Sequence, residues 1–144
     1  SHHKSLLLDN DSVEAAAMLH DIGIFLTDAP GIHCHGTHPY LAHGRLGADL
    51  LRSLNAPEKL ARVAERHTGT GLTANDLPRF GGILPDDRSY MPETLLERLI
   101  CYADKFYSKN GDMKEKSLDR VRASLAKFGA EALDRFEKLH KEFG

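Results

Sequence analysis

Residues 15–24 read AAAMLHDIGI and place His20 and Asp21 side by side at the end of a helix-favouring stretch. Gly23 follows as a residue typical of a helix stop, so the sequence predicts a helix with His20 near its C-terminal end. Imidazole and carboxylate groups are the usual protein ligands of Mn, Fe, Zn and Mg. Adjacent helical residues point roughly 100° apart, so the pair can share an ion only where the helix ends. The pair therefore predicts a metal centre completed by residues elsewhere in the chain.

Composition narrows the class of protein. The chain has 144 residues, 41% hydrophobic and 28% charged, which is typical of one globular domain. Lys and Arg number 19 against 21 Asp and Glu, so we expect no broad basic face and no sequence-specific nucleic-acid partner. The apolar runs are too short for a bilayer and we find no signal peptide, so no membrane partner is expected. Cys34 and Cys101 form no CxxC pair, which favours a reducing, cytoplasmic location.

The hydrophobic pattern is helical. Apolar residues recur at helical spacing, β-branched residues are sparse, and Asp11 with Glu14 resembles a capping box. We predict an all-α fold with no sheet and about six helices, over approximately 11–20, 39–54, 57–67, 92–109, 114–128 and 130–143. The Gly- and Pro-rich segments 24–38 and 72–92 are predicted loops, the second with one short helix at 74–77. Residues 1–144 are expected to form one compact domain, in which the helical pair of 110–144 packs on the core or contributes to a homodimer interface.

Three further residues lie where they could complete a metal centre. His43 falls in the predicted helix 39–54, and His67 lies at the end of the helix 57–67. Taken alone, each is better explained as a core or surface histidine. Asp104 lies in an otherwise apolar helix, where an unpaired charge would be costly, although a solvated carboxylate is the simpler alternative.

Several separated motifs together resemble one known family. AAAMLHDIGI and ICYADKF (100–106) are similar to the two metal-binding segments of the HD superfamily of metal-dependent phosphohydrolases, in its HDIG branch. HGRLGADLL (43–51) resembles a helix of the HD-GYP and related subfamilies, and ERHTGTG (65–71) resembles the segment that supplies a further histidine. The resemblance covers most of 11–107. It implies an all-α domain of the HD type with two divalent ions, drawn from Mn, Fe, Mg, Zn or Co.

The resemblance also implies a ligand set and an activity. One ion would be held by His20, Asp21 and Asp104, and the other by Asp21, His43 and His67. The implied activity is hydrolysis of a small phosphorylated substrate, a nucleotide or other phosphoester, by a water bridging the ions at the catalytic Asp21. Two alternatives stay open: a di-iron oxygenase of the same superfamily, and a metal- or nucleotide-sensing module without turnover.

Two positions depart from the family pattern. Ile24 stands where many members have a lysine that approaches the substrate, so Lys105 and Arg45 are the candidate catalytic cations. The family also has a histidine well upstream of the HD pair, whereas His2 and His3 are closer to His20 than that spacing allows. We therefore expect the most N-terminal helix of the domain to be missing from these 144 residues.

Other polar residues near the motifs have simpler interpretations. A dense cluster in the loop 24–38 resembles a soft-metal site, but we expect a solvated loop near the centre; its members are His33, Cys34, His35 and His38. Thr68 and Thr70 could offer hydroxyls to a phosphate, although GTG is also a plain helix stop. Arg66 is predicted to be a surface charge.

Overall fold

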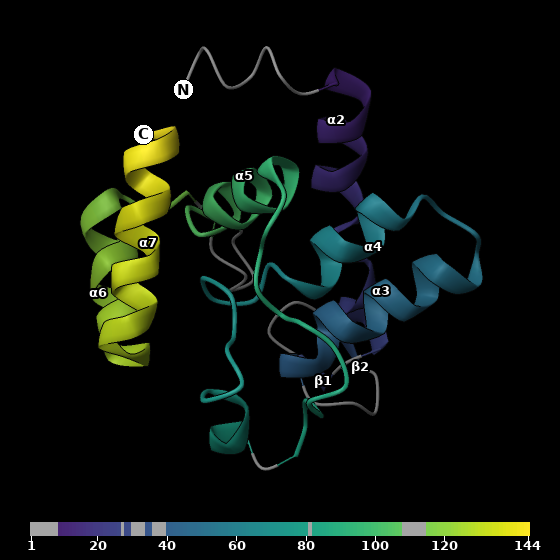
Figure 1. Ribbon diagram of the computed structural model, residues 1–144, viewed down its shortest axis with the longest axis horizontal. Helices are drawn as coiled ribbons and strands as arrows, with labels where there is room; N and C mark the ends of the chain where they lie inside the picture. The colour runs from purple at the N-terminus through teal and green to yellow at the C-terminus, as the bar shows by residue number, and fades with distance from the viewer. Residues whose placement is uncertain (1–8, 27, 30–33, 36–39, 81, 108–114) are drawn as a thin grey trace.

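The computed structural model describes residues 9–26, 28–29, 34–35, 40–80, 82–107 and 115–144. These residues form six α-helices (Figure 1): α2 (Asn10–Leu19), α3 (His43–Ser53), α4 (Glu58–Glu65), α5 (Leu95–Asp104), α6 (Leu118–Phe128) and α7 (Ala130–Phe143). Three short 3-10 segments accompany them: η1 (Ile22–Leu26), η3 (Tyr40–Ala42) and η4 (Leu77–Phe80). The prediction of an all-α fold is confirmed.

One pair of very short strands lies in the segment predicted as a loop without a sheet. β1 (Asp28–Ala29) and β2 (Cys34–His35) are antiparallel, with Asp28 opposite His35 and Ala29 opposite Cys34. Two residues per strand are far fewer than the five or six of a typical strand, and two strands do not make a stable layer. The pair therefore leaves the fold class unchanged.

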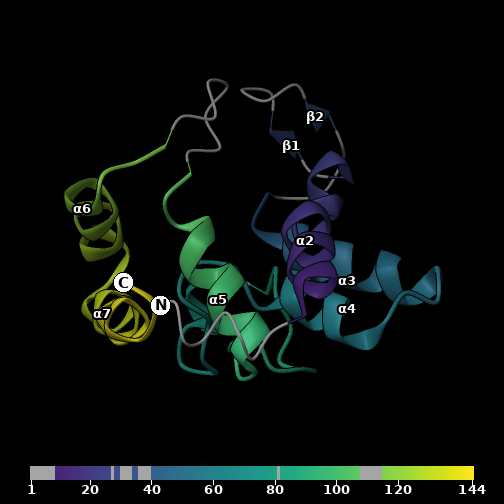
Figure 2. The same ribbon diagram turned by 90° about the horizontal axis from the view of Figure 1, so that it is seen from above.

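The helices form two groups on either side of α5. Figures 1 and 2 show α6 and α7 on one side of α5, and α2, α3 and α4 on the other. The main core joins α2, α3, α4 and α5 through small and branched residues: Ala16, Ala48, Leu51, Leu60, Ala61, Val63, Ala64, Leu96 and Ile100. Because alanines make up so much of this core, the helix backbones can approach closely, which brings the ends of the four helices together.

Gly23 permits the closest of these approaches. A Cβ on Gly23 would collide with the carbonyl oxygen of His43 and the amide nitrogen of Gly47, both in α3. Gly44 is similar, since a Cβ there would lie 2.6 Å from the carbonyl oxygen of Ala64 in α4. Gly23 was predicted as a helix stop, but α2 ends at Leu19 and Gly23 lies within η1. Its main structural contribution is therefore contact between η1 and the start of α3.

Two helices begin at other residues than predicted, because Asp9 and Thr94 are the residues that cap them. Asp9 caps α2 and accepts a hydrogen bond from the amide of Asp11 at 3.1 Å, so the predicted Asp11 capping box is wrong. Thr94 caps α5 by accepting from the amide of Glu97 at 3.2 Å, two residues after the predicted start at Pro92. In both places the oxygen acceptor immediately before the helix satisfies an otherwise unpaired amide.

The C-terminal helices pack on α5 through aromatic side chains. Phe136 of α7 is fully buried, and its ring stacks on that of Tyr102 in α5 with centroids 5.6 Å apart. Val121, Leu125 and Ala132 complete this second core. The α6–α7 pair therefore covers the face of α5 that the first core leaves open.

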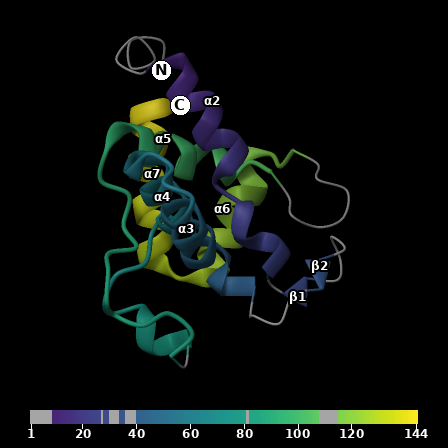
Figure 3. The same cartoon turned by 90° about the vertical axis from the view of Figure 1, so that its right-hand side faces the viewer.

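The long segment 72–92 runs along one side of the molecule and turns at η4 (Figure 3). It has a small core of its own, made by Leu72, Leu77, Leu84 and Tyr90. The short helix expected at 74–77 is replaced by the 3-10 turn from Leu77 to Phe80. Among the helices of the described residues, none is both long and apolar enough to span a membrane.

Candidate metal centre

The five predicted ligands lie together because one end of each of four helices reaches the same place. His20 and Asp21 follow α2, His67 comes two residues after α4, and Asp104 is the last residue of α5. His43 is the first residue of α3. Three of the four helices thus present their C-terminal ends, whose partial negative charge favours a cation. Helix packing brings together His and Asp residues that lie far apart in the sequence.

The most compact group is Asp21, His43 and His67. The Nε2 atoms of His43 and His67 are 2.9 Å apart, and the Oδ1 atom of Asp21 lies 3.0 Å from His67 Nε2 and 3.3 Å from His43 Nε2. Ligand bonds to a small divalent ion are about 2.1 Å long, so neighbouring ligand atoms of one ion lie about 3 Å apart. The spacing of these three atoms fits a shared cation.

His20 and Asp104 lie beside this group. His20 Nε2 is 3.1 Å from Asp104 Oδ1 and 3.2 Å from Asp21 Oδ2. The two carboxylate oxygens of Asp21 therefore face different imidazoles. His20, His67 and Asp104 also form a group close enough to hold an ion, as do Asp21, His43 and His67.

Hydrogen bonds to the backbone orient two of the imidazoles. The Nδ1 atoms of His20 and His67 each lie 2.7 Å from a carbonyl oxygen three residues earlier, on Ala17 and Ala64. A carbonyl only accepts, so Nδ1 carries a proton, and in the neutral imidazole Nε2 presents a lone pair to the cluster. Nε2 of His20 faces Asp21 and Asp104, and Nε2 of His67 faces Asp21, so a cation between these atoms would be bound by nitrogen and carboxylate oxygen together. The donor set of this centre therefore fits a divalent metal.

The protonation behaviour of the cluster shows the same need for positive charge. Burial opposes protonation of His20, but the carboxylates of Asp104 and Asp21 outweigh it and raise its pKa to about 9. Burial also opposes ionisation of Asp21, yet hydrogen bonds with His20, His43 and His67 hold its pKa far below the usual range. His67 is different, because its burial dominates and lowers its pKa.

The two predicted catalytic cations have different positions. Lys105 lies at the cluster, where its Nζ donates to Asp104 Oδ2 and to the carbonyl oxygen of His67, both at 2.9 Å. Arg45 instead donates from both Nη atoms to Asp87, at 2.6 and 2.9 Å, and to the hydroxyl of Tyr90 at 3.0 Å. Lys105 therefore lies at the cluster, as predicted for a catalytic cation. Arg45 does not, and its bonds instead connect the segment 72–92 to α3.

A cavity of about 390 Å³ opens beside the cluster. Its walls combine three of the predicted ligands with apolar side chains: Ala17, Met18, His20, Asp21, Ile100, Ala103, Asp104 and Tyr107. Met18 is 75% exposed and Tyr107 is 50% exposed. The sequence predictions did not include either residue, although Met18 lies only two positions before His20. His43 and His67 are buried and do not line this cavity.

The other polar residues singled out in the sequence either bind other parts of the protein or lie outside the residues that the structure describes. Thr70 is buried and donates to the carbonyl oxygen of Ala132 at 2.8 Å, which ties the GTG turn to α7. Arg66 is 9% exposed and donates to Glu93 Oε1 at 2.9 Å, so the prediction of a surface charge is wrong. The guanidinium also donates to the carbonyl oxygen of Met91 at 3.2 Å, so residues far along the chain bury it. The positions outside the described residues or without a described side chain are His2, His3, His33, Cys34, His35 and His38.

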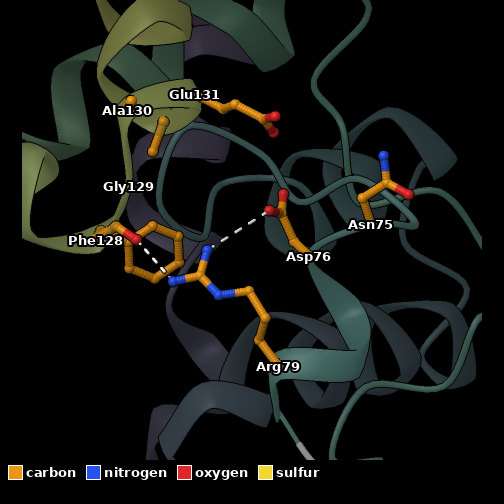
Figure 4. A pocket seen from close by; sticks show the side chains of 8 residues that line it. Asn75, Asp76, Arg79, Phe128, Gly129, Ala130 and Glu131 are labelled. Carbon is orange, nitrogen blue, oxygen red and sulfur yellow. Dashed lines mark hydrogen bonds and ion pairs between the residues drawn. The ribbon is translucent and has the colours of Figure 1, made fainter.

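A second cavity, of about 310 Å³, lies where η4 meets the α6–α7 turn (Figure 4). Arg79 crosses it, donating from Nη2 to the carbonyl oxygen of Phe128 at 2.8 Å while Nη1 lies 3.9 Å from Asp76. The guanidinium also lies over the ring of Phe128, 5.4 Å from its centroid. These contacts join the segment 72–92 to the C-terminal helices.

Comparison with known proteins gives two named relatives that match nearly the whole chain. One is the tRNA (cytidine(56)-2'-O)-methyltransferase of Thermoplasma volcanium, 35% identical over 134 residues, which cover 92% of this chain and 35% of that protein. The protein of the same name from Picrophilus torridus is 32% identical over 135 residues, or 93% of this chain and 35% of that protein. The chain therefore spans about a third of the length of these relatives.

A third relative is an uncharacterised protein of Methanocaldococcus jannaschii. It is 38% identical over 102 residues, which cover 71% of this chain and 52% of that protein. No solved structure matches the chain.

These relatives overturn the predicted activity. Two proteins that match most of the chain are named as tRNA methyltransferases, so the predictions of a phosphohydrolase and of a small phosphorylated substrate without a nucleic-acid partner are wrong. The physical reason is that a set of metal ligands specifies a cation-binding site but does not specify the substrate that binds to the cation. The formal charge of -2 was also a weak guide, since it omits any bound ions.

The family itself rests on a separate match. A family model described as the HD domain matches residues 2–108, which include α2 to α5 and all five residues of the cluster. The HDIG branch stays a prediction. With its HD pair, its distal aspartate and the intervening histidines gathered at one point, the chain belongs to the HD domain family.

Proposed function

We propose that this chain is a divalent-metal-binding HD domain that acts in tRNA modification, with its metal centre meeting the tRNA. The observation that carries the proposal is the convergence of five His and Asp side chains in a chain that matches tRNA-modifying relatives over 92–93% of its length. Methyl transfer is the named activity of whole relatives, of which this chain spans 35%. For this chain we propose binding of divalent metal and of tRNA, without the methyl transfer itself.

The donor set supports binding of two divalent ions from the group Mn, Fe, Mg, Zn and Co. Asp21, His43 and His67 would hold one ion, and His20 and Asp104 would hold the other together with the second oxygen of Asp21. Imidazole and carboxylate together suit these metals. The metals would supply positive charge, and the protein contributes their spacing and the adjoining cavity.

The charge of the centre supports tRNA as the partner. Two divalent ions against the carboxylates of Asp21 and Asp104 would leave a local charge of about +2 at the cavity. A phosphate-rich ligand requires such positive charge, and the chain as a whole carries a formal charge of -2. In this proposal the metal centre therefore takes the part that a basic surface has in other RNA-binding proteins.

The test measures metal content and tRNA binding in the same samples. The purified chain is analysed for metals, and its affinity for total tRNA is measured by filter binding with and without a chelator. We expect bound divalent metal, and a loss of tRNA affinity of at least about tenfold when the metal is removed. Asp21→Asn and Asp104→Asn should reproduce that loss.

Asp134→Asn provides the matched control, because this carboxylate is 69% exposed on α7 and, among the described residues, pairs only with Lys138, four positions later, at 3.4 Å. It should change neither metal content nor tRNA affinity. Equal tRNA affinity of the metal-free and metal-loaded chains would overturn the proposed link between the centre and tRNA.

A further inference from the structure

The imidazole of His67 can serve only one of the two metal positions. Its Nδ1 is committed to the carbonyl oxygen of Ala64 at 2.7 Å, which leaves one lone pair, on Nε2. That atom lies in both groups that could hold an ion, with Asp21 and His43 in one and with His20 and Asp104 in the other. Whichever ion takes this lone pair leaves the other position with fewer protein ligands.

Distances and burial assign His67 to the group with His43. His67 Nε2 is 2.9 Å from His43 Nε2 and 3.0 Å from Asp21 Oδ1. Both histidines are buried, with His67 1% exposed. We call Asp21, His43 and His67 the inner position. The outer position is then His20, Asp104 and the remaining oxygen of Asp21, all three of which line the cavity.

The two positions differ in chemistry as well as in access. The inner position offers two imidazole nitrogens and one carboxylate oxygen. The outer position offers one nitrogen and oxygens from two carboxylates. Nitrogen ligands favour Zn, Fe and Ni, whereas oxygen ligands favour Mg and Mn, which bind more weakly. The ligand atoms alone therefore predict tighter binding at the inner position.

Lys105 adds a second difference. Its Nζ lies 2.9 Å from Asp104 Oδ2, and the side chain is 12% exposed and anchored on the carbonyl oxygen of His67 at 2.9 Å. The ammonium group therefore neutralises part of the Asp104 charge and repels a divalent ion placed beside that carboxylate.

We propose that the inner position binds its ion first and tightly, and that Lys105 keeps the outer position weak and exchangeable. This inference rests on the metal binding proposed above. An ion at the outer position would enter and leave through the cavity, and an anionic ligand arriving there would offset the repulsion by Lys105. The outer ion is thus the one that responds to a bound phosphate, while the inner ion stays with the protein.

The experiment titrates Mn²⁺ alone into metal-free protein and follows the free ion by electron paramagnetic resonance. We expect one tight ion per chain and a second that binds at least about tenfold more weakly. Lys105→Gln should tighten the second ion by about tenfold and leave the first within about twofold. Lys105→Arg keeps the charge and should leave both affinities close to those of the natural chain. Lys127→Gln, at an exposed position on α6, is the matched control for loss of one positive charge.

Ligand variants separate the two positions. His43→Gln should abolish the tight class, and Asp104→Asn should abolish only the weak class. If no Mn²⁺ binds at all, the metal function proposed above fails. If two ions bind with equal affinity, the proposal of unequal positions is disproved and the metal function stands. If folded Lys105→Gln leaves the affinity for the second ion unchanged, the proposed role of Lys105 is disproved. Should Lys105→Gln unfold the chain, the selective losses in His43→Gln and Asp104→Asn still decide the question.

Discussion

The backbone of Gly23 lies directly against that of Gly47, so closely that a Cβ on Gly23 would collide with the amide nitrogen of Gly47 and the carbonyl oxygen of His43. This contact fixes where α3 begins relative to the HD pair. The glycine in the HD motif therefore positions His43, a proposed ligand that lies 20 residues further along the chain.

Gly23→Ala should disrupt both stability and metal binding. The added methyl group meets backbone atoms that cannot rotate away, so we expect a loss of about 2–3 kcal/mol in the free energy of unfolding. His43 would move with α3, and metal affinity should fall. Urea denaturation and Mn²⁺ titration measure the two effects. Gly82→Ala is the control, because a Cβ at this position would have nothing within 4 Å and only the positive φ opposes the change. The metal affinity of this variant should equal that of the natural chain.

Arg45→Gln should loosen the segment 72–92 without affecting the metal centre. Arg45 pairs with both oxygens of Asp87, but Asp87 is 47% exposed, so we expect a loss of only about 0.5–1 kcal/mol. Limited proteolysis should cut the segment faster, while the metal content stays the same. A loss of bound metal in this variant would instead show that Arg45 belongs to the centre.

Glu97→Gln should destabilise the junction of α4 and α5. The Glu97 side chain is 1% exposed and accepts from Arg62 Nε at 2.9 Å, with Arg66 Nη1 at 3.4 Å. Removing its charge leaves Arg62 without a buried counter-charge and takes one of two from Arg66, which still pairs with buried Glu65, at a cost of about 2–3 kcal/mol. Glu58→Gln, whose side chain is 60% exposed and pairs with Arg52, should cost under about 1 kcal/mol in the same urea measurement.

The contribution of Glu97 should also depend on pH. Burial opposes ionisation of Glu97, but hydrogen bonds from the amide of Glu93, from Thr94 and from Arg62 outweigh it and hold its pKa below the ordinary 4.5. The charged form therefore stabilises the folded state above pH 4.5, and this stabilisation is lost as the pH falls through the lowered pKa. The difference in free energy of unfolding between the natural chain and Glu97→Gln should be constant near neutrality and shrink in acid. A difference that grows in acid would contradict this assignment.

Removal of divalent ions should lower the melting temperature. Ions that bind only the folded cluster stabilise it by mass action, about 2.7 kcal/mol at a concentration 100 times Kd. For a chain of this size that corresponds to a fall in Tm of about 5–10 °C when a chelator is added. Asp21→Asn should melt at the same temperature with and without chelator. Scanning calorimetry of both proteins provides the measurement.

The sequence alone was sufficient for the features that depend on local chemistry. Helical periodicity predicted the all-α fold, and the ligand types around His20 and Asp21 pointed to a family that the comparison confirmed. The same reasoning failed for the activity, because the ligands of a cation do not specify the molecule that meets it. It also treated Arg66 as a surface charge, since burial depends on neighbours that the local sequence does not contain.

Tertiary structure decided every relationship between distant side chains. His20 and Asp104 are 84 positions apart, and only the packing of α2 against α5 brings their ligand atoms to 3.1 Å. Packing also turned the two oxygens of Asp21 toward different imidazoles and placed Lys105 on Asp104. The sequence by itself thus determined which atoms could bind a metal, because ligand chemistry belongs to each residue. The structure decided which of them lie close enough to share an ion, because distance and burial arise only when the helices pack.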